Sequence, residues 1–243
     1  MSIFLEAEWR HLLMLNYPVE PALLTAPPGT EIDFFEGQTF VSVVGFMFLK
    51  TRVMGVAIPL HQNFEEVNLR YYVRRGDRRG VVFVREIVPQ PAIAVVARVL
   101  YNEQYIARRM RHDIGDVVRY EWQTGRSWEG LWGRPAGDPQ PLRPGSLEEF
   151  ITEHYWGYSG QRDGGCMEYQ VEHPRWNVQT LAESGLSADV ERLYGKPFVD
   201  VLSRPPASAL LADGSAIVVR RGHRIPDLLG GIDDRNSAAL RSE

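Results

Sequence analysis

The sequence predicts an α+β protein dominated by an antiparallel, barrel-like β-sheet, with two or three short helices. Many short segments rich in β-branched and aromatic residues are separated by turns containing glycine or proline, a pattern typical of a β-rich core. One pair of segments, from Phe64 to Val88, also alternates polar and apolar residues around an arginine-rich turn. The 243 residues, 44% of them hydrophobic, suffice for a sizeable core.

The segment from Phe64 to Val88 is expected to be a β-hairpin whose turn contains Gly76. Glu66, Asn68 and Arg70 alternate with apolar residues, so one face of the first strand carries a carboxylate, an amide and a guanidinium. Such a face is either the solvated side of a sheet or the lining of a concave, ligand-binding surface.

Two segments precede this hairpin. Residues Glu6 to Asn16 fit either a short amphipathic helix or an edge strand, and Pro18 and Pro21 end the segment in both cases. Residues Thr39 to Phe48 are β-branched and aromatic, which favours a buried strand interrupted by Gly45.

A helix is expected directly after the hairpin. Pro91 suits a first helical turn, and the apolar residues from Ala92 to Tyr101 surround most of the helix, which carries Arg98. Tyr105 then falls in the loop or turn after this helix.

The rest of the chain alternates short strands with turns and two short helices. In chain order we expect a hairpin over 117–132, a surface loop over 133–145, a helix from the capping box at Ser146 to His154 or Tyr155, strands over 167–172 and 177–181, a helical turn or two over 188–194, and strands over 198–202 and 216–220. No repeat interrupts this pattern, so residues 1–222 form one predicted domain and residues 223–243 a polar tail.

Composition excludes several classes of protein. A net charge of −4 argues against binding to nucleic acid through bulk electrostatics. The single cysteine, Cys166, excludes an intrachain disulfide and fits a reducing compartment. The N-terminus lacks the basic region of a secretory signal, and no stretch is apolar enough to span a bilayer. We therefore expect a cytoplasmic protein without a membrane partner.

The sequence also lacks the common cofactor and catalytic motifs. It contains no P-loop, no GxGxxG after a strand and no GxSxG elbow, so no nucleotide cofactor is expected. Cys166, His173, His154 and Glu168 are metal-ligating types, but no tight pair such as CxxC or HExxH is present, so no metal is expected.

Five short motifs carry a resemblance to a known family. They are AEWR near residue 7, FEEVNLRYYV at Phe64 to Val73, AR-VLYNEQY at the end of the expected helix, EEFITEHYWGYS at Glu148 to Ser159, and VEHPRW at Val171 to Trp176. Their succession resembles the YqjF-like family of uncharacterised bacterial proteins over roughly residues 5 to 220. That family is similar in fold to acetoacetate decarboxylase, which implies a cone-shaped β-barrel with an internal pocket.

The resemblance implies a pocket and argues against the chemistry of acetoacetate decarboxylase, which forms a Schiff base through a lysine. The lysine pair of that enzyme falls at Gln104-Tyr105 here, and neither residue can form an imine. Lys50 and Lys196, the two lysines of the chain, lie elsewhere. Glu66 matches a glutamate of the equivalent strand, with Arg98 on the helix that faces it.

These observations define a candidate site. Glu66 and Tyr105 are the candidate catalytic proton carriers, and the candidate ligand-binding residues are Arg70, Arg98, Tyr72 and His173. Each has a structural alternative: a salt bridge across the sheet for the charged residues, a core position for the tyrosines and a turn bonded to backbone for the histidine.

The leading hypothesis is a protein that binds a small organic acid or related small molecule in the pocket. If it is an enzyme, acid–base chemistry of a lyase, isomerase or hydrolase fits better than imine formation. The alternative is a non-catalytic ligand-binding or protein-interaction module. Arg74, Arg75, Arg78 and Arg79 form either a solvated turn or a docking site for an acidic protein or RNA. An exposed sheet edge would support a homodimer, although no feature requires one.

Overall fold

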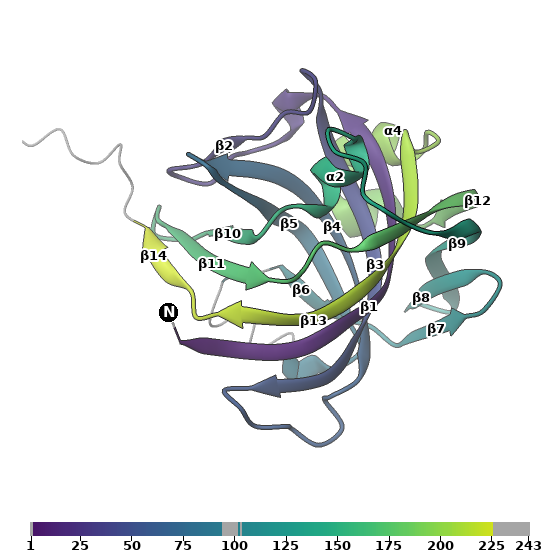
Figure 1. The fold of residues 1–243 in the computed structure, drawn as a ribbon, viewed down its shortest axis with the longest axis horizontal. Coiled ribbons are helices and arrows are strands. Elements are labelled where there is room, and N and C mark those ends of the chain that lie inside the picture. The colour runs from purple at the N-terminus through teal and green to yellow at the C-terminus, as the bar shows by residue number, and fades with distance from the viewer. Residues whose placement is uncertain (1, 94–101, 103, 226–243) are drawn as a thin grey trace, which may run out of the picture.

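The computed structural model describes residues 2–93, 102 and 104–225, and it is a mainly β structure with short helices, as predicted (Figure 1). Residues 91–93 are helical. The remainder of the helix expected up to Tyr101, including Arg98, lies outside the described residues.

The strands are β1 (Ile3–Val19), β2 (Glu31–Ile32), β3 (Thr39–Val53), β4 (Phe64–Arg75), β5 (Arg78–Val88), β6 (Tyr105–Ala107), β7 (Met110–Ile114), β8 (Val118–Thr124), β9 (Ser127–Pro141), β10 (Trp156–Gly160), β11 (Cys166–Glu172), β12 (Asn177–Ser187), β13 (Ser208–Arg220) and β14 (His223–Ile225). The helical elements are η1 (Pro21–Leu23), α2 (Leu147–Thr152), α3 (Val190–Tyr194), η2 (Lys196–Phe198) and α4 (Val199–Leu202).

Seven of these strands close into a ring. Their order is β11-β10-β5-β4-β3-β1-β13, and β13 also pairs with β11 through Val171 opposite Val219. The pairs are antiparallel except β5–β10, and the short β6 also adds to β5 in parallel. Figure 1 shows the ring with α2 toward its upper end and the loop between β3 and β4 at its lower end. The predicted barrel-like sheet is therefore present.

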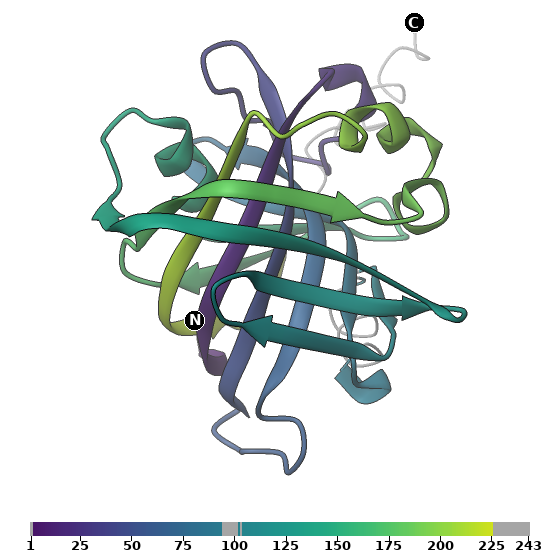
Figure 2. The same ribbon diagram turned by 90° about the vertical axis from the view of Figure 1, so that its right-hand side faces the viewer.

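A second layer covers one outer side of the ring. From β13 the sheet continues through β12, β9, β8 and β7, which cross over β1 and β3 in Figure 2, with the small helices beside them. The ring of Tyr120 on β8 approaches β3 at Gly45, where an added Cβ would lie 2.6 Å from the tyrosine Cδ2. Gly45 therefore permits close packing between the layers and does not interrupt the strand.

Strand β4 is buried on both faces because it lies between the ring interior and this second layer. Val67, Leu69 and Tyr71 point outward into the core that the ring shares with the second layer. Phe64 and Tyr72, on the alternate face, belong to the core inside the ring. The face that carries Glu66, Asn68 and Arg70 is thus the inner one.

A β-bulge in β5 changes which of its residues face inward. Asn68 lies opposite Glu86 and Leu69 opposite Arg85, but Arg70 lies opposite Phe83, so Val84 has no partner on β4. Consequently both Phe83 and Glu86 share the inner face with the polar residues of β4.

Several sequence-based expectations for the first half of the chain need correction. Residues 6–16 form neither a helix nor an edge strand, because β1 is 17 residues long and pairs with both β3 and β13. Pro18 lies inside β1, where the pairing with β13 has already ended at Asn16. Tyr105 lies in strand β6 and not in a loop, because it pairs in parallel with Glu86.

The second half shows four further differences. The glycine- and proline-rich residues 133–145 are largely strand, because β9 extends to Pro141. The pairing of β8 with β9 does not extend beyond Gly133, so the later prolines of β9 lie along a free edge of the sheet. Helix α2 ends at Thr152, short of His154. Residues 198–202, expected to be a strand, are helical: Phe198 is the last residue of η2, and the other four form α4. Residues 223–225, expected in the polar tail, form β14 against β11.

The arginine-rich turn is paired with carboxylates and is not a solvated tip. Arg75 and Arg78 contact the fully buried Glu168 at 3.3 and 2.6 Å. Arg79 contacts Asp33 at 2.8 Å, and Arg74 forms an exposed pair with Glu31 (2.9 Å). These local partners account for the basic cluster without an acidic protein or RNA.

Candidate functional site

A cavity of about 500 Å³ lies inside the ring. Most of its wall is apolar and aromatic, but a group of polar side chains interrupts it along β4 and the strands beside it. Glu66, Asn68 and Arg70 come from β4, Glu86 from β5 and Tyr105 from β6. Because alternate residues of a strand share a face, the polar alternation in β4 delivers all three of its polar side chains to the same wall.

Glu66 is the best-connected polar group in this wall. Its carboxylate accepts hydrogen bonds from Asn68 Nδ2 (3.0 Å to Oε1) and from Tyr105 Oη (3.0 Å to Oε2). Burial raises the pKa of Glu66 to about 7, against the opposing effects of these two hydrogen bonds and of the Arg70 charge. At neutral pH the carboxyl group is therefore able both to accept and to donate a proton.

Tyr105 stays protonated and serves as a donor. Burial raises the pKa of its hydroxyl well above the ordinary value, and the negative charges of Glu66 and Glu86 raise it further. The register that places Tyr105 opposite Glu86 in the β5–β6 pair thus brings one phenol between two carboxyl groups.

Arg70 supplies a cation to the same wall. Its Nη2 donates to the carbonyl of Ile151 in α2 at 3.2 Å, and its guanidinium carbon lies 5.7 Å from the centre of the Tyr72 ring. Its Nε is buried and has no hydrogen-bond partner among the described residues. Arg70 also lines the cavity, where its charge favours an anionic ligand.

His154 adds a histidine–carboxylate pair. Its Nε2 lies 3.2 Å from Oδ2 of Asp33, which also accepts a hydrogen bond from Arg79 Nε at 2.8 Å. Burial would raise the pKa of Asp33, but the hydrogen bonds from His154 and Arg79 hold it below the ordinary value. Burial lowers the pKa of His154 to about 4, so its ring is neutral, with Nε2–H directed at Asp33.

His173 also lines the cavity, at the end of β11. Its ring stacks on Trp176 with centroids 4.1 Å apart, and its Nδ1 donates to the carbonyl of Pro174 at 2.9 Å. Burial lowers its pKa. His173 therefore both makes the backbone hydrogen bond expected of a structural histidine and lines the cavity.

The structure thus brings together Glu66, Arg70, Tyr105 and His173 from the six predicted site residues. Tyr72 does not line the cavity: its hydroxyl lies 2.5 Å from Ser42 Oγ. Arg98 lies outside the described residues.

Glu86, Asn68 and His154 are lining residues that were not predicted as site residues. Asn68 was identifiable from its position between Glu66 and Arg70. Strict alternation from Phe83 would have placed Glu86 on the opposite face, because the bulge leaves no signal in the sequence. His154 follows α2, and only the tertiary fold brings it to Asp33.

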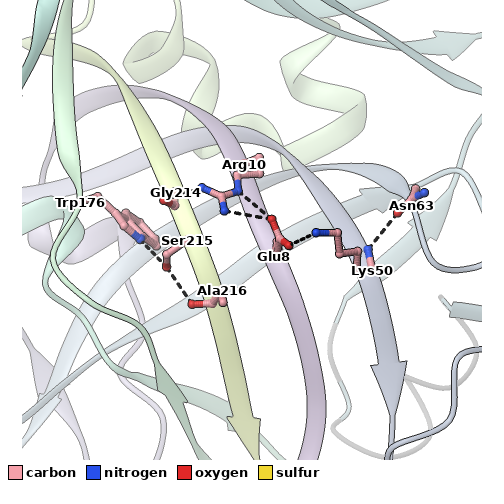
Figure 3. Close-up of polar contacts among 8 residues, drawn as sticks. All are labelled: Glu8, Arg10, Lys50, Asn63, Trp176, Gly214, Ser215 and Ala216. Atoms are coloured by element: carbon pink, nitrogen blue, oxygen red, sulfur yellow. Dashed lines mark hydrogen bonds and ion pairs between the residues drawn. The ribbon is translucent and has the colours of Figure 1, made fainter.

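Both lysines lie away from this wall. Figure 3 shows Lys50 on β3 with its ammonium 2.5 Å from Glu8, a neighbour of Arg10. The Lys50 side chain is 77% exposed. Lys196 belongs to η2 in the second layer. Neither lysine side chain is therefore among the residues that line the cavity.

Two features are absent from the described part of the chain. No helix among these residues is long and apolar enough to cross a membrane. Nor do three or more histidine, cysteine, aspartate or glutamate side chains gather there in a group that could hold a metal ion.

Comparisons with known proteins agree with this architecture. The family model of DUF2071, described as an uncharacterized conserved protein, matches residues 6–216. The uncharacterized protein YqjF of Bacillus subtilis (strain 168) is 28% identical over 189 residues, which cover 74% of this chain and 77% of that protein.

Solved structures show the same fold at low sequence identity. The acetoacetate decarboxylase of Legionella pneumophila superposes with a TM-score of 0.65 at 14% identity, covering 93% of this chain and 88% of that one. The enduracididine biosynthesis enzyme MppR complexed with pyruvate gives a TM-score of 0.65 at 11% identity, covering 93% and 92%. The fold is therefore that of acetoacetate decarboxylase, as the resemblance implied.

Proposed function

The chain belongs to the DUF2071 family of uncharacterized conserved proteins, and we propose that this member binds a small organic acid in the cavity inside its ring. Arg70 anchors the acid group, and Glu66 with Tyr105 moves a proton on the bound molecule. The observation that carries the proposal is the gathering of these three side chains on one wall of an otherwise apolar cavity.

The cavity has the character of a small-molecule site. Its volume of about 500 Å³ falls in the range of roughly 300–1,000 Å³ typical of ligand pockets, which are mainly apolar with a few convergent polar groups. A guanidinium in such a wall favours a carboxylate, with which it forms charge-assisted hydrogen bonds. The related fold of MppR, solved with pyruvate, supports a ligand of this class.

Glu66 is suited to proton transfer because its pKa of about 7 matches neutral conditions. In the proposed step, ionised Glu66 removes a proton from the carbon next to a ligand carbonyl, and the electron pair moves to the carbonyl oxygen as an enolate. Tyr105 orients the Glu66 carboxylate through its 3.0 Å hydrogen bond. Return of a proton from Glu66 to the same carbon regenerates the carbonyl compound, so the step exchanges that hydrogen with solvent and epimerises the carbon where it is a stereocentre.

A second candidate function is binding without catalysis. The mainly apolar lining favours it, because such a surface contributes affinity and no chemistry. Under this alternative, Glu66 and Tyr105 provide hydrogen bonds that select the ligand.

Binding is tested by thermal shift with hexanoate and, as the uncharged control, hexanol. We expect hexanoate to raise the melting temperature of the wild type and of Arg74→Gln, and not that of Arg70→Gln. Arg74 is the matched control because it lies on the same strand but pairs with Glu31 at the surface. Equal shifts in all three proteins would exclude Arg70 as the anchor.

Catalysis is tested with 2-oxohexanoate in D₂O, by following deuterium exchange at its C3 by NMR. The proposal predicts exchange above the buffer rate in the wild type and a loss of at least about 100-fold in Glu66→Gln. Binding without exchange in the wild type would assign the protein to the non-catalytic alternative.

A further inference from the structure

The inner face of β4 changes from aromatic to polar along the strand. At the start of the strand, Phe64 stacks on Phe48 with ring centroids 4.8 Å apart, and Trp9 packs edge-on against Phe48. Further along the strand come Glu66 and Arg70, the latter held by α2. Six residues of a β-strand span about 20 Å, so the aromatic end and the anchoring end are well separated.

The aromatic end adjoins the loop between β3 and β4. Met54 and Ile58 line the cavity and are nevertheless 69% and 45% exposed, so the cavity opens at this loop. Val56 and Leu60, 63% and 91% exposed, continue the apolar surface beyond the opening. Contiguous exposed apolar residues at a cavity opening are typical of a ligand- or partner-binding surface.

Hydrogen bonds hold this loop at its base. Asn63 Oδ1 accepts from the backbone N–H of Lys50 at 2.9 Å (Figure 3), and Thr51 N donates to the Gln62 carbonyl at 3.0 Å. Met54 N donates to Phe4 O at 2.8 Å, which ties the loop to β1. The exposed apolar side chains are therefore presented from a fixed base.

One cavity-lining indole is fixed in a similar way. Trp176 Nε1 donates to Ser215 Oγ at 2.9 Å, and Ser215 donates to the Ala216 carbonyl at 2.8 Å (Figure 3). Because its only polar atom is satisfied by the protein, Trp176 offers an apolar surface to the cavity.

We propose that the ligand is an amphipathic monocarboxylic acid, with its carboxylate at Arg70 and an extended apolar chain that runs along β4 and leaves the cavity between Met54 and Ile58. This inference rests on the proposed function and specifies its ligand class. A cavity of about 150 Å³ already holds benzene, so a three- or four-carbon acid would leave most of this one unfilled. An extended alkyl chain advances about 1.3 Å per carbon, so a chain that runs about 20 Å along β4 from Arg70 to the opening has roughly sixteen carbons.

The experiment measures by calorimetry the dissociation constants of straight-chain carboxylates from C4 to C18, each below its micelle concentration. We expect affinity to rise about fourfold for each methylene that the cavity encloses, and more slowly once the chain passes the opening. A flat dependence on chain length would overturn the inference and leave the proposed function standing. Binding that survives Arg70→Gln, or that decanol reproduces, would instead contradict the proposed function.

The opening is tested with Ile58→Ser, and with Leu23→Ser as a matched control. Leu23 is an exposed leucine of η1 that does not line the cavity. Ile58→Ser should weaken hexadecanoate about five- to tenfold and pentanoate less than twofold, and Leu23→Ser should change neither. Equal effects of Ile58→Ser on both acids would contradict the proposed path. An unchanged affinity for hexadecanoate, with a dimer of the wild type lost in this variant, would also contradict it, because the loop would then serve self-association.

Discussion

The hydroxyl of Tyr105 donates a 3.0 Å hydrogen bond to Oε2 of Glu66, a residue 39 positions earlier in the chain. The two meet because β6 adds to β5 in parallel while β4 adds to β5 on its other side. Glu66 is buried, so this hydrogen bond takes the place of one to water at its carboxyl group. That exchange has consequences for stability, binding and acid–base behaviour.

Replacing Glu66 by glutamine should remove a pH-dependent loss of stability. The pKa of Glu66 is about 7 in the folded protein and about 4.5 in the unfolded chain, so between these values only the folded state keeps the proton. The free energy of unfolding therefore falls as pH rises through this window, by about 3 kcal/mol for this group. His154 contributes equally to both proteins, so the change in unfolding free energy from pH 5 to pH 8, measured with urea, should be more negative in wild type than in Glu66→Gln by about 3 kcal/mol; equal changes in both proteins would contradict the assignment.

Anion binding should weaken with rising pH across the same range. Below pH 7, Glu66 is neutral and the charge of Arg70 is available to a carboxylate; above it, ionised Glu66 repels the ligand. We expect the dissociation constant for hexanoate to increase about tenfold or less between pH 6 and pH 8, because a tenfold change corresponds to a shift of one unit in the pKa of Glu66 on binding. In Glu66→Gln the dissociation constant should not change with pH, and a retained dependence would point to another group.

His154 should act in the opposite sense at acid pH. Its pKa is about 4 in the folded protein and about 6.5 when unfolded. Below pH 6.5 His154 therefore binds a proton in the unfolded chain but not in the folded protein. Stability from this group is lost as pH falls, by about 2 kcal/mol at pH 5. Comparing His154→Gln with wild type at pH 7 and pH 5 isolates this term. A wild type that loses no more stability than the variant would mean that His154 is charged in the fold.

Removing the charge of Glu168 should be far more costly than removing that of Glu31. Glu168 is fully buried and is shared by Arg75 and Arg78, whereas Glu31 pairs with Arg74 at the surface. We expect Glu168→Gln to reduce the free energy of unfolding by about 2–4 kcal/mol, because the partly buried arginines lose their counter-ion. Glu31→Gln should cost less than about 1 kcal/mol. Similar costs would show that the turn is solvated after all.

An alanine at Gly45 should separate the two layers. The new Cβ would meet the Tyr120 ring, and overpacking of this kind costs about 1–3 kcal/mol. Gly160→Ala is the control, because nothing lies within 4 Å of an added Cβ there. In the double variant with Tyr120→Leu, the cost of the alanine should be smaller than in the single variant. Additive costs would mean that the ring does not restrict residue 45.

The hairpin β4–β5 and the polar face of β4 were predictable because both depend on residues close together in sequence. The direction in which that face points was not predictable, since both sides of β4 are buried and an apolar face usually marks the interior. Here the apolar face of Val67, Leu69 and Tyr71 packs under the second layer, and the polar face lines the cavity.

The errors elsewhere arose where tertiary structure overrode local preference. Valine and phenylalanine favoured a strand at 198–202, but Phe198 and Leu202, one helical turn apart, bury the same face of the helical segment in the outer core. The four-residue spacing of these two residues was the available signal. No feature of the local sequence predicted that β9 would continue through its prolines along a free edge.

The bulge at Val84 determines the charge inside the cavity. With this unpaired residue, β5 turns Phe83 and Glu86 inward and leaves Arg85 on the side of Tyr194, in the outer core. If β5 paired without the bulge, strict alternation from Phe83 would bring Arg85 inward and turn Glu86 out. The bulge thus places a carboxylate, and not a guanidinium, on the wall that carries Glu66, and it sets the charge of the cavity without changing any residue of β4.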